Sequence, residues 1–411
     1  MKKPKETSYP KEKIKVLLLE NIHAEAERMF SAERYQIRTI GKALDEEALI
    51  REIGDVSILG IRSKTKVTKK VLAAAPRLLA VGAFCIGTDQ IDFAACDEKG
   101  VVAFNAPYSN TRSVVELALA EILSLLRKVP DKNADMHKGI WDKSSAGSFE
   151  ARGKRLGIVG YGNIGSQLSV LAEALGMEVF FYDVQEKLVL GNAKKCRNLA
   201  ELLKKSNIVS LHVDGRPSNK NLIGEKEFKL MRPGAYFLNI SRGSVVDIAA
   251  LARHLISGHL AGAGVDVFPE EPKGKDEPFA SPLRGIPNVI LTPHIGGSTK
   301  EAQENIAAYV PARVIDFINT GNTNMSVNFP NVQLPRLKNA HRIIHIHKNV
   351  PGVLASVNEI FARNKVNISG QYLKTTERIG YTITDIERKH GKDILTELKA
   401  APYTIRTRIL Y

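Results

Sequence analysis

The sequence of 411 residues predicts an α/β protein with two doubly wound parallel sheets and a smaller C-terminal α+β unit. Three observations lead to this prediction. Short apolar stretches alternate with amphipathic helical stretches over most of the chain, a pattern typical of parallel sheets covered by helices. A glycine-rich turn at residues 160–165 opens a second series of such stretches, and the residues after 341 follow a β-α-β-β-α-β order.

The first series of strands and helices lies near the beginning of the chain. Five apolar stretches separated by helical patterns predict five parallel strands, at residues 14–20, 35–40, 56–59, 78–83 and 101–104. The loops at residues 60–63 and 83–88 follow the carboxyl ends of two of these strands. An open parallel sheet binds its ligands at these ends, so both loops are candidate binding loops.

The second series begins with the turn Gly160-Tyr161-Gly162-Asn163-Ile164-Gly165, between an apolar stretch and a helical pattern. In this context the first glycine allows a tight turn, the second lets a pyrophosphate approach the backbone, and the third packs helix on strand. The helix N-terminus adds free N–H groups and a partial positive charge. The next strand ends at Asp183, whose carboxylate would accept ribose hydroxyls and repel a 2′-phosphate. The turn therefore predicts NAD as cofactor.

Six strands are expected in this second unit, at residues 156–159, 178–182, 208–211, 235–240, 262–267 and 289–291. Trp141, the only tryptophan, lies in a polar loop before them and is either a subunit contact or a core residue. A helix at 299–319 and a short strand at 325–328 have no sheet of their own, so we assign them to the first unit. The expected domains are residues 1–109 with 299–335, residues 110–298, and residues 341–411.

Composition narrows the function classes. The net charge is +15, from 59 Lys and Arg against 44 Asp and Glu, and such a balance can indicate nucleic-acid binding. The basic residues, however, are spread along helices and an N-terminal tail (Lys2, Lys3, Lys5) without interleaved aromatic residues. We therefore expect a basic surface that attracts anionic metabolites and no nucleic-acid partner.

The compartment is predicted from the cysteines and from the hydropathy. Cys85, Cys96 and Cys196 have neither paired nor metal-ligand spacing, so we expect three buried free thiols and no metal site. Such thiols are typical of a reducing compartment. No apolar run reaches the roughly 20 residues of a membrane span, and no signal core follows the charged first residues. We expect a cytoplasmic protein without membrane contact.

Three residues at strand ends could carry chemistry. His294 lies between Pro293 and Gly296, and a histidine in such a setting suits proton transfer. Glu271, in a loop flanked by prolines, could orient the imidazole and stabilise its charged form. Arg242 could hold a carboxylate through two parallel hydrogen bonds, although a surface pair with Asp247 is the alternative. Beside NAD, these three groups suit hydride transfer to and from a 2-hydroxy acid.

These motifs together resemble the D-isomer-specific 2-hydroxyacid dehydrogenase family. The resemblance rests on the glycine turn with Asp183, the Arg242-Gly243 pair and residues 266–272 and 292–299. Within the family, five shorter stretches resemble bacterial members that act on D-3-phosphoglycerate; they lie at residues 62–63, 84–88, 105–107, 109–113 and 147–150. The C-terminal unit resembles an ACT domain, and the match extends over nearly the whole chain.

The resemblance implies a flavodoxin-like substrate lobe, a Rossmann NAD lobe and a ferredoxin-like α+β ACT domain. It implies Arg242, Glu271 and His294 as the catalytic residues, and Arg62, Ser63, Asn110 and Gln303 as substrate contacts. It also implies a set of residues around NAD, which includes the glycines of the turn. They are Gly160, Gly162, Asn163, Ile164, Gly165, Asp183, Ile240, Ser241, Arg242, Asp266, His294, Ile295, Gly296 and Gly297.

The implied reaction is the oxidation of D-3-phosphoglycerate to 3-phosphohydroxypyruvate, the first step of L-serine biosynthesis, in a homotetramer inhibited by L-serine. Relatives of this type also reduce 2-oxoglutarate to 2-hydroxyglutarate. His347, Asn349 and Asn367 would bind the serine, and a solvated strand face is the alternative for His345 and His347. Unlike the linker of those relatives, the linker at residues 337–341 has no adjacent glycines, so the strength with which serine binding is transmitted to the active site stays open.

Two other functions stay open from the sequence. One is a dehydrogenase of an unphosphorylated 2-hydroxy acid such as lactate or glycerate. The other is a transcriptional co-regulator that uses the same fold to sense NAD. The C-terminal unit speaks against the first, and the presence of Arg242, Glu271 and His294 speaks against the second.

Overall fold

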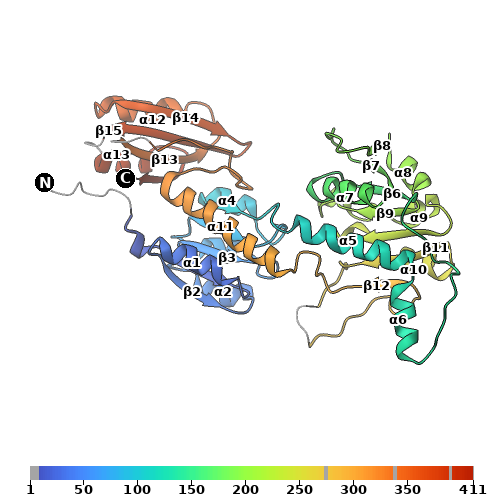
Figure 1. Cartoon of the computed structure of the whole chain (residues 1–411). Coiled ribbons are helices and arrows are strands. Elements are labelled where there is room, and N and C mark those ends of the chain that lie inside the picture. Colours follow the sequence, from blue (N-terminus) through green and yellow to red (C-terminus); the bar gives the residue numbers. More distant parts are fainter. Residues whose placement is uncertain (1–8, 273–275, 337–339, 388–390, 411) are drawn as a thin grey trace. The chain divides into compact units, whose positions relative to one another are not determined.

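The structure is a computed structural model that describes residues 9–272, 276–336, 340–387 and 391–410. The chain divides into two compact units, one made of residues 1–109 and 303–411 and the other of residues 110–302. The predicted fold class is confirmed, because the chain contains two parallel sheets covered by helices and a C-terminal antiparallel sheet with two helices (Figure 1). In the described part of the chain, no helix is long and apolar enough to cross a membrane.

The first unit contains a parallel five-stranded sheet with the order β2-β1-β3-β4-β5. Its strands are β1 (Lys15–Leu19), β2 (Gln36–Ile40), β3 (Ile58–Ile61), β4 (Ala80–Ala83) and β5 (Val102–Phe104). Its helices are α1 (Ala24–Ala32), α2 (Glu46–Glu52), α3 (Lys69–Ala73), α4 (Phe93–Lys99) and most of α11 (Lys300–Thr320), after a 3₁₀ turn at Lys11–Lys13. Side-chain caps start four of these helices, since His23, Asp45, Thr68 and Asp92 each accept a backbone N–H of the first turn.

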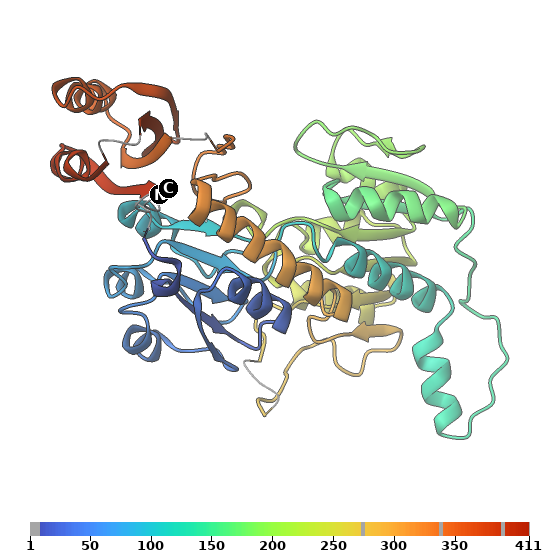
Figure 2. The same cartoon turned by 60° about the vertical axis from the view of Figure 1, so that its left-hand side comes forward.

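Helix α11 packs on this sheet although some 200 residues separate it from β5 (Figure 2). Phe317 of α11 is buried with Phe30 of α1 and Phe104 of β5, and the ring centroids of Phe104 and Phe317 are 6.1 Å apart. Gly82 of β4 admits the helix, because a Cβ there would lie 2.7 Å from the side chain of Val310. Apolar burial therefore attaches this late segment to the N-terminal sheet.

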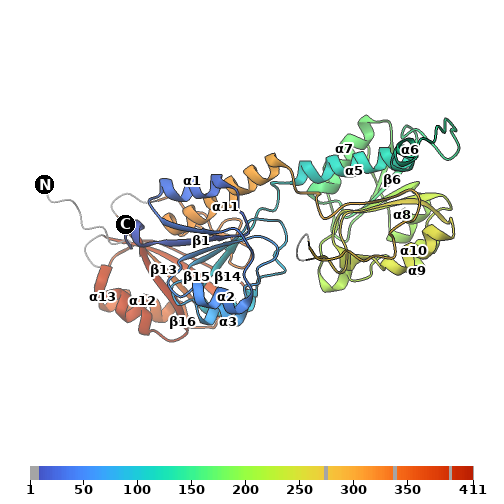
Figure 3. The ribbon, with the colours of Figure 1, turned by 90° about the horizontal axis from the view of Figure 1, so that it is seen from below.

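The C-terminal part forms an antiparallel sheet with the order β14-β15-β13-β16. Its strands are β13 (Ala340–Lys348), β14 (Ile368–Thr375), β15 (Ile379–Glu387) and β16 (Thr404–Leu410). Helices α12 (Val353–Arg363) and α13 (Gly391–Ala400) lie side by side on one face of it (Figure 3). This is the predicted β-α-β-β-α-β plan.

The other face of this sheet packs within the first unit on the end of α11. Ile344 and Tyr381 share a core with Phe317, and the Tyr381 hydroxyl donates to the carbonyl of Gly321 at 2.6 Å. Arg342 is fully buried, binds Asp385 through two hydrogen bonds of 2.8 and 2.9 Å, and donates to the carbonyl of Thr320. Shared apolar and charged contacts thus place this sheet in the first unit. The division into three domains stays a prediction.

The second unit contains a parallel seven-stranded sheet with the order β12-β11-β10-β9-β6-β7-β8. Its strands are β6 (Arg155–Val159), β7 (Glu178–Tyr182), β8 (Lys194–Lys195), β9 (Ile208–Leu211), β10 (Ala235–Asn239), β11 (Leu260–Val265) and β12 (Val289–Leu291). Its helices are α5 (Thr111–Leu126), α6 (Val129–His137), α7 (Asn163–Ala174), α8 (Leu199–Lys205), α9 (Glu225–Leu230) and α10 (Ile248–Ile256), with 3₁₀ turns at Pro217–Asn219 and Gly243–Val245. The strand order reverses between β6 and β9, and such a switch point opens a crevice at the carboxyl ends.

Four local predictions differ from the structure. The sheet of the second unit has a seventh strand, the two-residue β8, which is too short to show a pattern in the sequence. Helix α6 was not predicted. Residues 325–328 form only an isolated bridge from Ser326 to Phe104, because the Asn328 side chain bonds the backbone of Val101 and Ala103 in place of a strand. Trp141 is 72% exposed, so its prediction as a core residue is wrong.

Candidate active site

The glycine turn follows β6 at the switch point of the second sheet. Gly160 has a positive φ of 92°, and a Cβ there would lie 2.4 Å from the carbonyl oxygen of His212. Gly165 packs α7 against the turn, because its Cβ would lie 2.3 Å from the oxygen of Gly160. A Cβ on Gly162, in contrast, would meet nothing within 4 Å. The protein itself therefore needs two of the glycines, and the third leaves open space before the helix.

Helix α7 begins at this open space with Asn163 and Ile164. Its N-cap, Gly162, has no side chain to accept the first backbone N–H groups. Uncapped N–H groups and the helix dipole together favour an anion at a helix N-terminus. The turn thus fits the pyrophosphate of a dinucleotide, as the sequence predicts.

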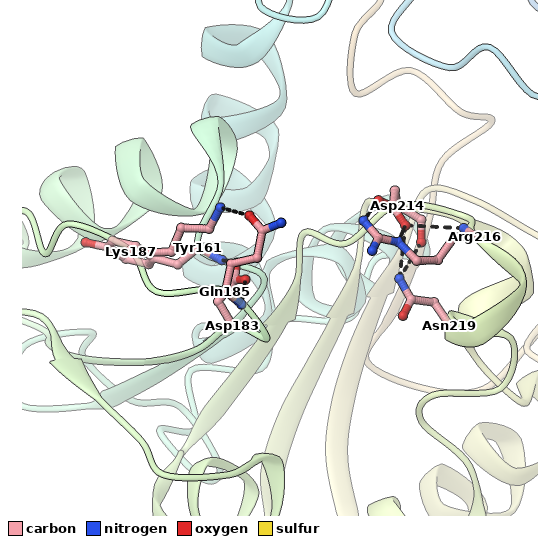
Figure 4. A network of polar contacts seen from close by, with 7 residues as sticks. All are labelled: Tyr161, Asp183, Gln185, Lys187, Asp214, Arg216 and Asn219. Atoms are coloured by element: carbon pink, nitrogen blue, oxygen red, sulfur yellow. Dashed lines mark hydrogen bonds and ion pairs between the residues drawn. The ribbon is translucent and has the colours of Figure 1, made fainter. Parts of the chain in front are cut away.

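Asp183 is fixed at the end of β7, next to the turn (Figure 4). One carboxylate oxygen accepts the N–H of Tyr161 at 2.8 Å, and the other accepts the N–H of Gln185 at 2.8 Å. Nearby, Asp214 pairs with Arg216, whose raised pKa owes most to Asp214 and a smaller part to Asp183. The Asp183 carboxylate is thus held next to the glycine turn, where the sequence predicts a contact with the ribose hydroxyls of NAD. The sequence did not point to the Asp214–Arg216 pair.

Hydrogen bonds to Asp266 hold the loop that carries His294. The Asp266 carboxylate accepts the Thr292 hydroxyl at 2.6 Å and the N–H groups of Ile295 and Gly296 at 2.8 Å each. Its backbone oxygen accepts the His294 N–H at 2.8 Å. Asp266 is 1% exposed and follows β11 directly, so a rigid strand end defines the path of the loop. His294 itself has a positive φ of 55°, a strained conformation that is often found at functional sites.

His294 and Glu271 form a hydrogen-bonded pair. Nδ1 of His294 lies 2.9 and 3.1 Å from the two carboxylate oxygens of Glu271, which also accepts the N–H of Phe268. The hydrogen bond and charge of Glu271 raise the pKa of His294, against the opposing effect of burial. Burial is the largest single effect on Glu271 and raises its pKa, but the hydrogen bond and charge of His294, the N–H of Phe268 and the charge of Arg242 together lower the net pKa. With Nδ1 engaged, Nε2 is the nitrogen available for proton transfer.

Arg242 joins this pair through a close contact between two loops. A Cβ on Gly243 would lie 2.0 Å from the carbonyl of Phe268, so only glycine lets the Arg242 loop approach the loop of Glu271. The guanidinium donates to the carbonyl of Ser241 at 2.7 Å. Its charge is the smallest of the contributions to the pKa values of Glu271 and His294, and it acts downward on both, although the net pKa of His294 stays raised. The structure thus brings together the three residues that the sequence singled out.

Asp247, the alternative partner of Arg242, is the N-cap residue of α10. Its carboxylate caps α10 by accepting the N–H groups of Ala249 and Ala250. Sequence reasoning missed the residue that shapes the Arg242 loop, which is Asn239. Its amide oxygen accepts the N–H and hydroxyl of Ser241, and its amide nitrogen donates to the carbonyl of Arg242. An asparagine at a strand end is too common for the sequence alone to reveal this role.

Other predicted contact residues lie around this loop or in the other unit. Asn110 is the N-cap residue of α5, but its side chain makes no capping bond, and its Oδ1 is buried without a partner among the described residues. It lies against the His294 loop, since a Cβ on Gly297 would come 2.2 Å from its Nδ2. Ile240 lies against Gly296 in the same way. The remaining predicted substrate residues, Arg62, Ser63 and Gln303, belong to the first unit.

Glu121 was not singled out by the sequence, yet it lies next to Asp266. It is on α5, 2% exposed, and neither carboxylate oxygen has a hydrogen-bond partner among the described residues. Gly264 makes room for it, because a Cβ there would lie 2.3 Å from Oε2. Burial, together with the charge of Asp266, raises the pKa of Glu121 to about 8. The carboxyl is therefore protonated at neutral pH.

This burial predicts a pH-dependent stability. A raised pKa stabilises the fold at low pH, and this contribution is lost as pH rises from the ordinary glutamate value toward 8. We expect the free energy of unfolding of the parent to fall, relative to Glu121→Gln, by about 1.4 kcal/mol per pH unit across this window. Urea unfolding at pH 5.5 and 7.5 measures the difference. Glu116→Gln, on the exposed side of α5, is the control, and equal pH slopes in parent and Glu121→Gln would contradict the prediction.

A second prediction concerns Glu271. Its carboxylate raises the pKa of His294, and a base works only in its neutral form. Glu271→Gln keeps a hydrogen-bond acceptor but removes the charge. For the 2-hydroxy-acid oxidation that the sequence predicts, we therefore expect the rising limb of kcat/KM against pH to move to lower pH, with a lower plateau. A steady-state pH profile measures this, with Glu270→Gln as the neighbouring exposed control; an unmoved limb in Glu271→Gln would show that the pair does not set the pKa.

The predicted effector residues lie at opposite ends of the C-terminal sheet. His347 pairs with Gly380, whereas Ile368, next to Asn367, pairs with Ile386. Gly380 and Ile386 are six residues apart on β15, so these two ends of the sheet are separated by about 20 Å. Asn349 is at the His347 end, where its amide donates to the carbonyl of Thr376. Within one copy, Asn367 is therefore remote from the other two.

The alternative of a solvated face for His345 and His347 is wrong. The two side chains are 1% and 3% exposed and their rings stack at 5.2 Å. Nε2 of His345 lies 2.8 Å from the hydroxyl of Thr404. Both histidines share a face of the sheet with Ile343, which α12 and α13 cover. Burial lowers the pKa of both, that of His345 to about 4, with a contribution from His347.

The three cysteines are free, with Cys96 and Cys196 buried and Cys85 only partly so. Burial raises the pKa of Cys96 to about 12 and also raises that of Cys196. Lys2, Lys3, Lys5 and residues 337–339 of the linker lie outside the described residues, so predictions about the N-terminal tail and the missing glycines stay predictions.

Comparisons with known proteins agree with this geometry. Residues 119–296 match the NAD-binding domain of the D-isomer specific 2-hydroxyacid dehydrogenases, and residues 343–406 match an ACT domain like that of the AHAS small subunit. D-3-phosphoglycerate dehydrogenase of Escherichia coli (strain K12) is 52% identical over 407 residues, covering 98% of this chain and 99% of the relative. The enzyme of the same name from Dictyostelium discoideum is 51% identical over 405 residues, with the same coverage.

Solved structures show the same fold. D-lactate dehydrogenase from Aquifex aeolicus, complexed with NAD and lactic acid, superposes with a TM-score of 0.68 at 27% identity. The match covers 77% of this chain and the whole of that chain.

Proposed function

Since the chain belongs to the D-isomer-specific 2-hydroxyacid dehydrogenase family and uses NAD, we propose that it oxidises D-3-phosphoglycerate to 3-phosphohydroxypyruvate. The observation that carries the proposal is the His294–Glu271 pair within electrostatic reach of Arg242. The names of relatives that match over nearly their whole length support the choice of substrate. The reaction would be the first step of L-serine biosynthesis.

The residues of the second unit fit NAD. Gly162 leaves space before α7, and Asp183 offers a fixed carboxylate for the ribose hydroxyls. Asn163, Ile164, Ile240, Ser241, Asp266 and residues 294–297 complete the proposed cofactor contacts. When bound, NAD supplies the acceptor for the hydride that leaves C2 of the substrate.

The chain's own residues would move the proton and hold the substrate. Nε2 of neutral His294 takes the hydroxyl proton, and in the reverse direction the imidazolium returns it to the carbonyl oxygen. Glu271 keeps the ring in place and stabilises its charged form. The Arg242 guanidinium binds the C1 carboxylate in two parallel hydrogen bonds and polarises the carbonyl. These steps need one base, one orienting carboxylate and one cation, all of which the site contains.

The remaining substrate contacts are proposed for Arg62, Ser63, Asn110 and Gln303. The buried, unpartnered Oδ1 of Asn110 beside the His294 loop supports a polar ligand at that point. Arg62 and Ser63 follow β3, at the carboxyl end of a parallel sheet, where ligands are bound. A guanidinium and a hydroxyl suit the phosphate group, and the net charge of +15 favours a multiply anionic substrate.

We also propose regulation by L-serine through the ACT domain. His347 and Asn349 lie about 20 Å from the level of Asn367 in one copy, so a site that contains all three needs Asn367 of another copy. This supports an assembly in which ACT sheets pair, and a homotetramer is the proposed form. Serine would then inhibit only the assembled enzyme. The proposed cytoplasmic location and the absence of nucleic-acid binding stay predictions from composition.

One spectrophotometric assay tests the proposal. NADH formation from D-3-phosphoglycerate, and NADH consumption with 3-phosphohydroxypyruvate, are measured with and without L-serine. We expect turnover with both and inhibition by serine. Faster turnover of lactate or glycerate would favour an unphosphorylated substrate, and no turnover of any 2-hydroxy acid would favour an NAD-sensing co-regulator. Consumption of NADH with 2-oxoglutarate would add the proposed side reaction.

A further inference from the structure

A buried carboxylate fixes the loop that carries Arg62 and Ser63. Glu20, which follows β1 and is 8% exposed, accepts three backbone N–H groups of this loop. Oε1 accepts the N–H groups of Arg62 at 3.2 Å and Thr65 at 2.9 Å, and Oε2 accepts that of Lys64 at 3.1 Å. The three donors bracket Ser63, so the backbone on both sides of that residue is held by one side chain.

The backbone of Glu20 is itself in an unusual conformation. Its φ is +63°, and that of Asn21 is +50°, a region that residues other than glycine rarely adopt. The N–H of Glu20 donates to the carbonyl of Ile40 at the end of β2, which holds this bend in place. Strained residues persist where surrounding contacts fix them, and they concentrate at functional sites.

A backbone carbonyl of the same loop, that of Arg62, is also hydrogen-bonded. Nε2 of Gln90 donates to the oxygen of Arg62 at 2.7 Å and reaches the oxygen of Gly87 at 3.4 Å. Thr65 is fully buried, whereas Ser63 is exposed. The peptide groups on either side of Arg62 are thus bonded inward, and the exposed tip of the loop is left for a ligand.

We propose that Glu20 is a positioning residue for the phosphate group of the substrate. It holds the loop in the one conformation in which the Arg62 guanidinium and the Ser63 hydroxyl bind a phosphate monoester together. The carboxylate does not bind the phosphate, since like charges repel, and the three N–H groups compensate its charge. Glu20 thereby sets the preference for a phosphorylated over an unphosphorylated 2-hydroxy or 2-oxo acid. This inference rests on the proposed function.

The chemistry of the contact requires a carboxylate. Glutamate offers two acceptor oxygens, which three N–H groups use. In Glu20→Gln one of these oxygens becomes an NH₂ donor, which faces at least one backbone N–H whichever way the amide turns. The variant keeps the size of the side chain but loses at least one bond, so the loop loosens while the fold is kept.

The test compares two substrates in the reverse direction, 3-phosphohydroxypyruvate and hydroxypyruvate, for the full-length parent, Glu20→Gln and the control Asp45→Asn. Asp45 caps α2 in the same unit by accepting the N–H of Ala48. For Glu20→Gln we expect the ratio of kcat/KM values, phosphorylated over unphosphorylated, to fall at least tenfold. The fall should come from KM of the phosphorylated substrate, with kcat within threefold of the parent. Asp45→Asn should keep the parental ratio.

A second readout separates this inference from the proposed function. Hydrogen exchange of the amides at residues 62, 64 and 65 should be at least tenfold faster in Glu20→Gln than in Asp45→Asn. An equal loss for both substrates, or an unchanged ratio, would overturn the role of Glu20 in phosphate selection. A parent that turns over neither substrate would contradict the proposed function instead. Unchanged exchange at the three amides would overturn the positioning role in either case.

Discussion

Replacing His294 by alanine is expected to lower kcat for D-3-phosphoglycerate oxidation by about 10²- to 10⁴-fold, because the reaction loses its general base. In the proposed reaction the imidazole takes the hydroxyl proton, and Glu271 contacts its Nδ1 at 2.9 Å. The His294 side chain is 48% exposed, so its loss should leave the fold and NAD binding intact. Steady-state NADH formation measures the rate, and fluorescence titration with NADH measures cofactor binding.

The matched control is His137→Ala, which removes an exposed histidine of α6 in the same unit. We expect its kcat to equal that of the parent. If His294→Ala kept turnover within a few-fold of the parent while binding NADH normally, the imidazole would not be the base.

Replacing Arg242 by lysine is expected to lower kcat/KM for 3-phosphohydroxypyruvate by about 10²- to 10³-fold. The charge is kept, but lysine cannot bind a carboxylate in two parallel hydrogen bonds, nor polarise the adjacent carbonyl from the same position. Gly243 brings the backbone of this loop against Phe268, so the arginine is held at a defined distance from Glu271. Steady-state kinetics in the reverse direction give kcat and KM separately.

Arg253→Lys, in α10 of the same unit, is the control, because Arg253 is exposed and pairs with Glu225 at the surface. We expect it to leave both constants unchanged. A loss of less than threefold in Arg242→Lys would mean that charge alone suffices and that the two-bond grip is not used.

The regular elements could be predicted because their patterns are continuous. Strand β7 and helix α12 occupy the residues expected for them. The first contains an unbroken apolar run and lies between Gly176 and Asp183, and the second is an amphipathic run between Gly352 and Asn364. The candidate catalytic residues could be predicted because prolines or glycines flank them in loops that follow strands. His294, Glu271 and Arg242 therefore stood out before their geometry was known.

The supporting residues could not be predicted, for a physical reason. Glu20 and Asn239 act through side-chain hydrogen bonds to loops, and Glu121 is buried beside the charge of Asp266. A lone polar residue has no period in the sequence that reveals such a partner. The strand predicted at residues 325–328 is absent for a similar reason. The Asn328 side chain accepts the N–H of Ala103, a bond that a strand would make through its backbone. The buried histidines of β13 alternate like a solvated face, and only the helices that cover the sheet decide otherwise.

The most direct test of the account is the pH dependence of kcat/KM in both directions, measured on the same preparation with 3-phosphoglycerate and with 3-phosphohydroxypyruvate. If His294 is base and acid in turn, oxidation rises and reduction falls with pH around one pKa above the ordinary histidine value, as the pairing with Glu271 requires. Profiles that are flat across this range, or that change in the same direction for both reactions, would contradict it.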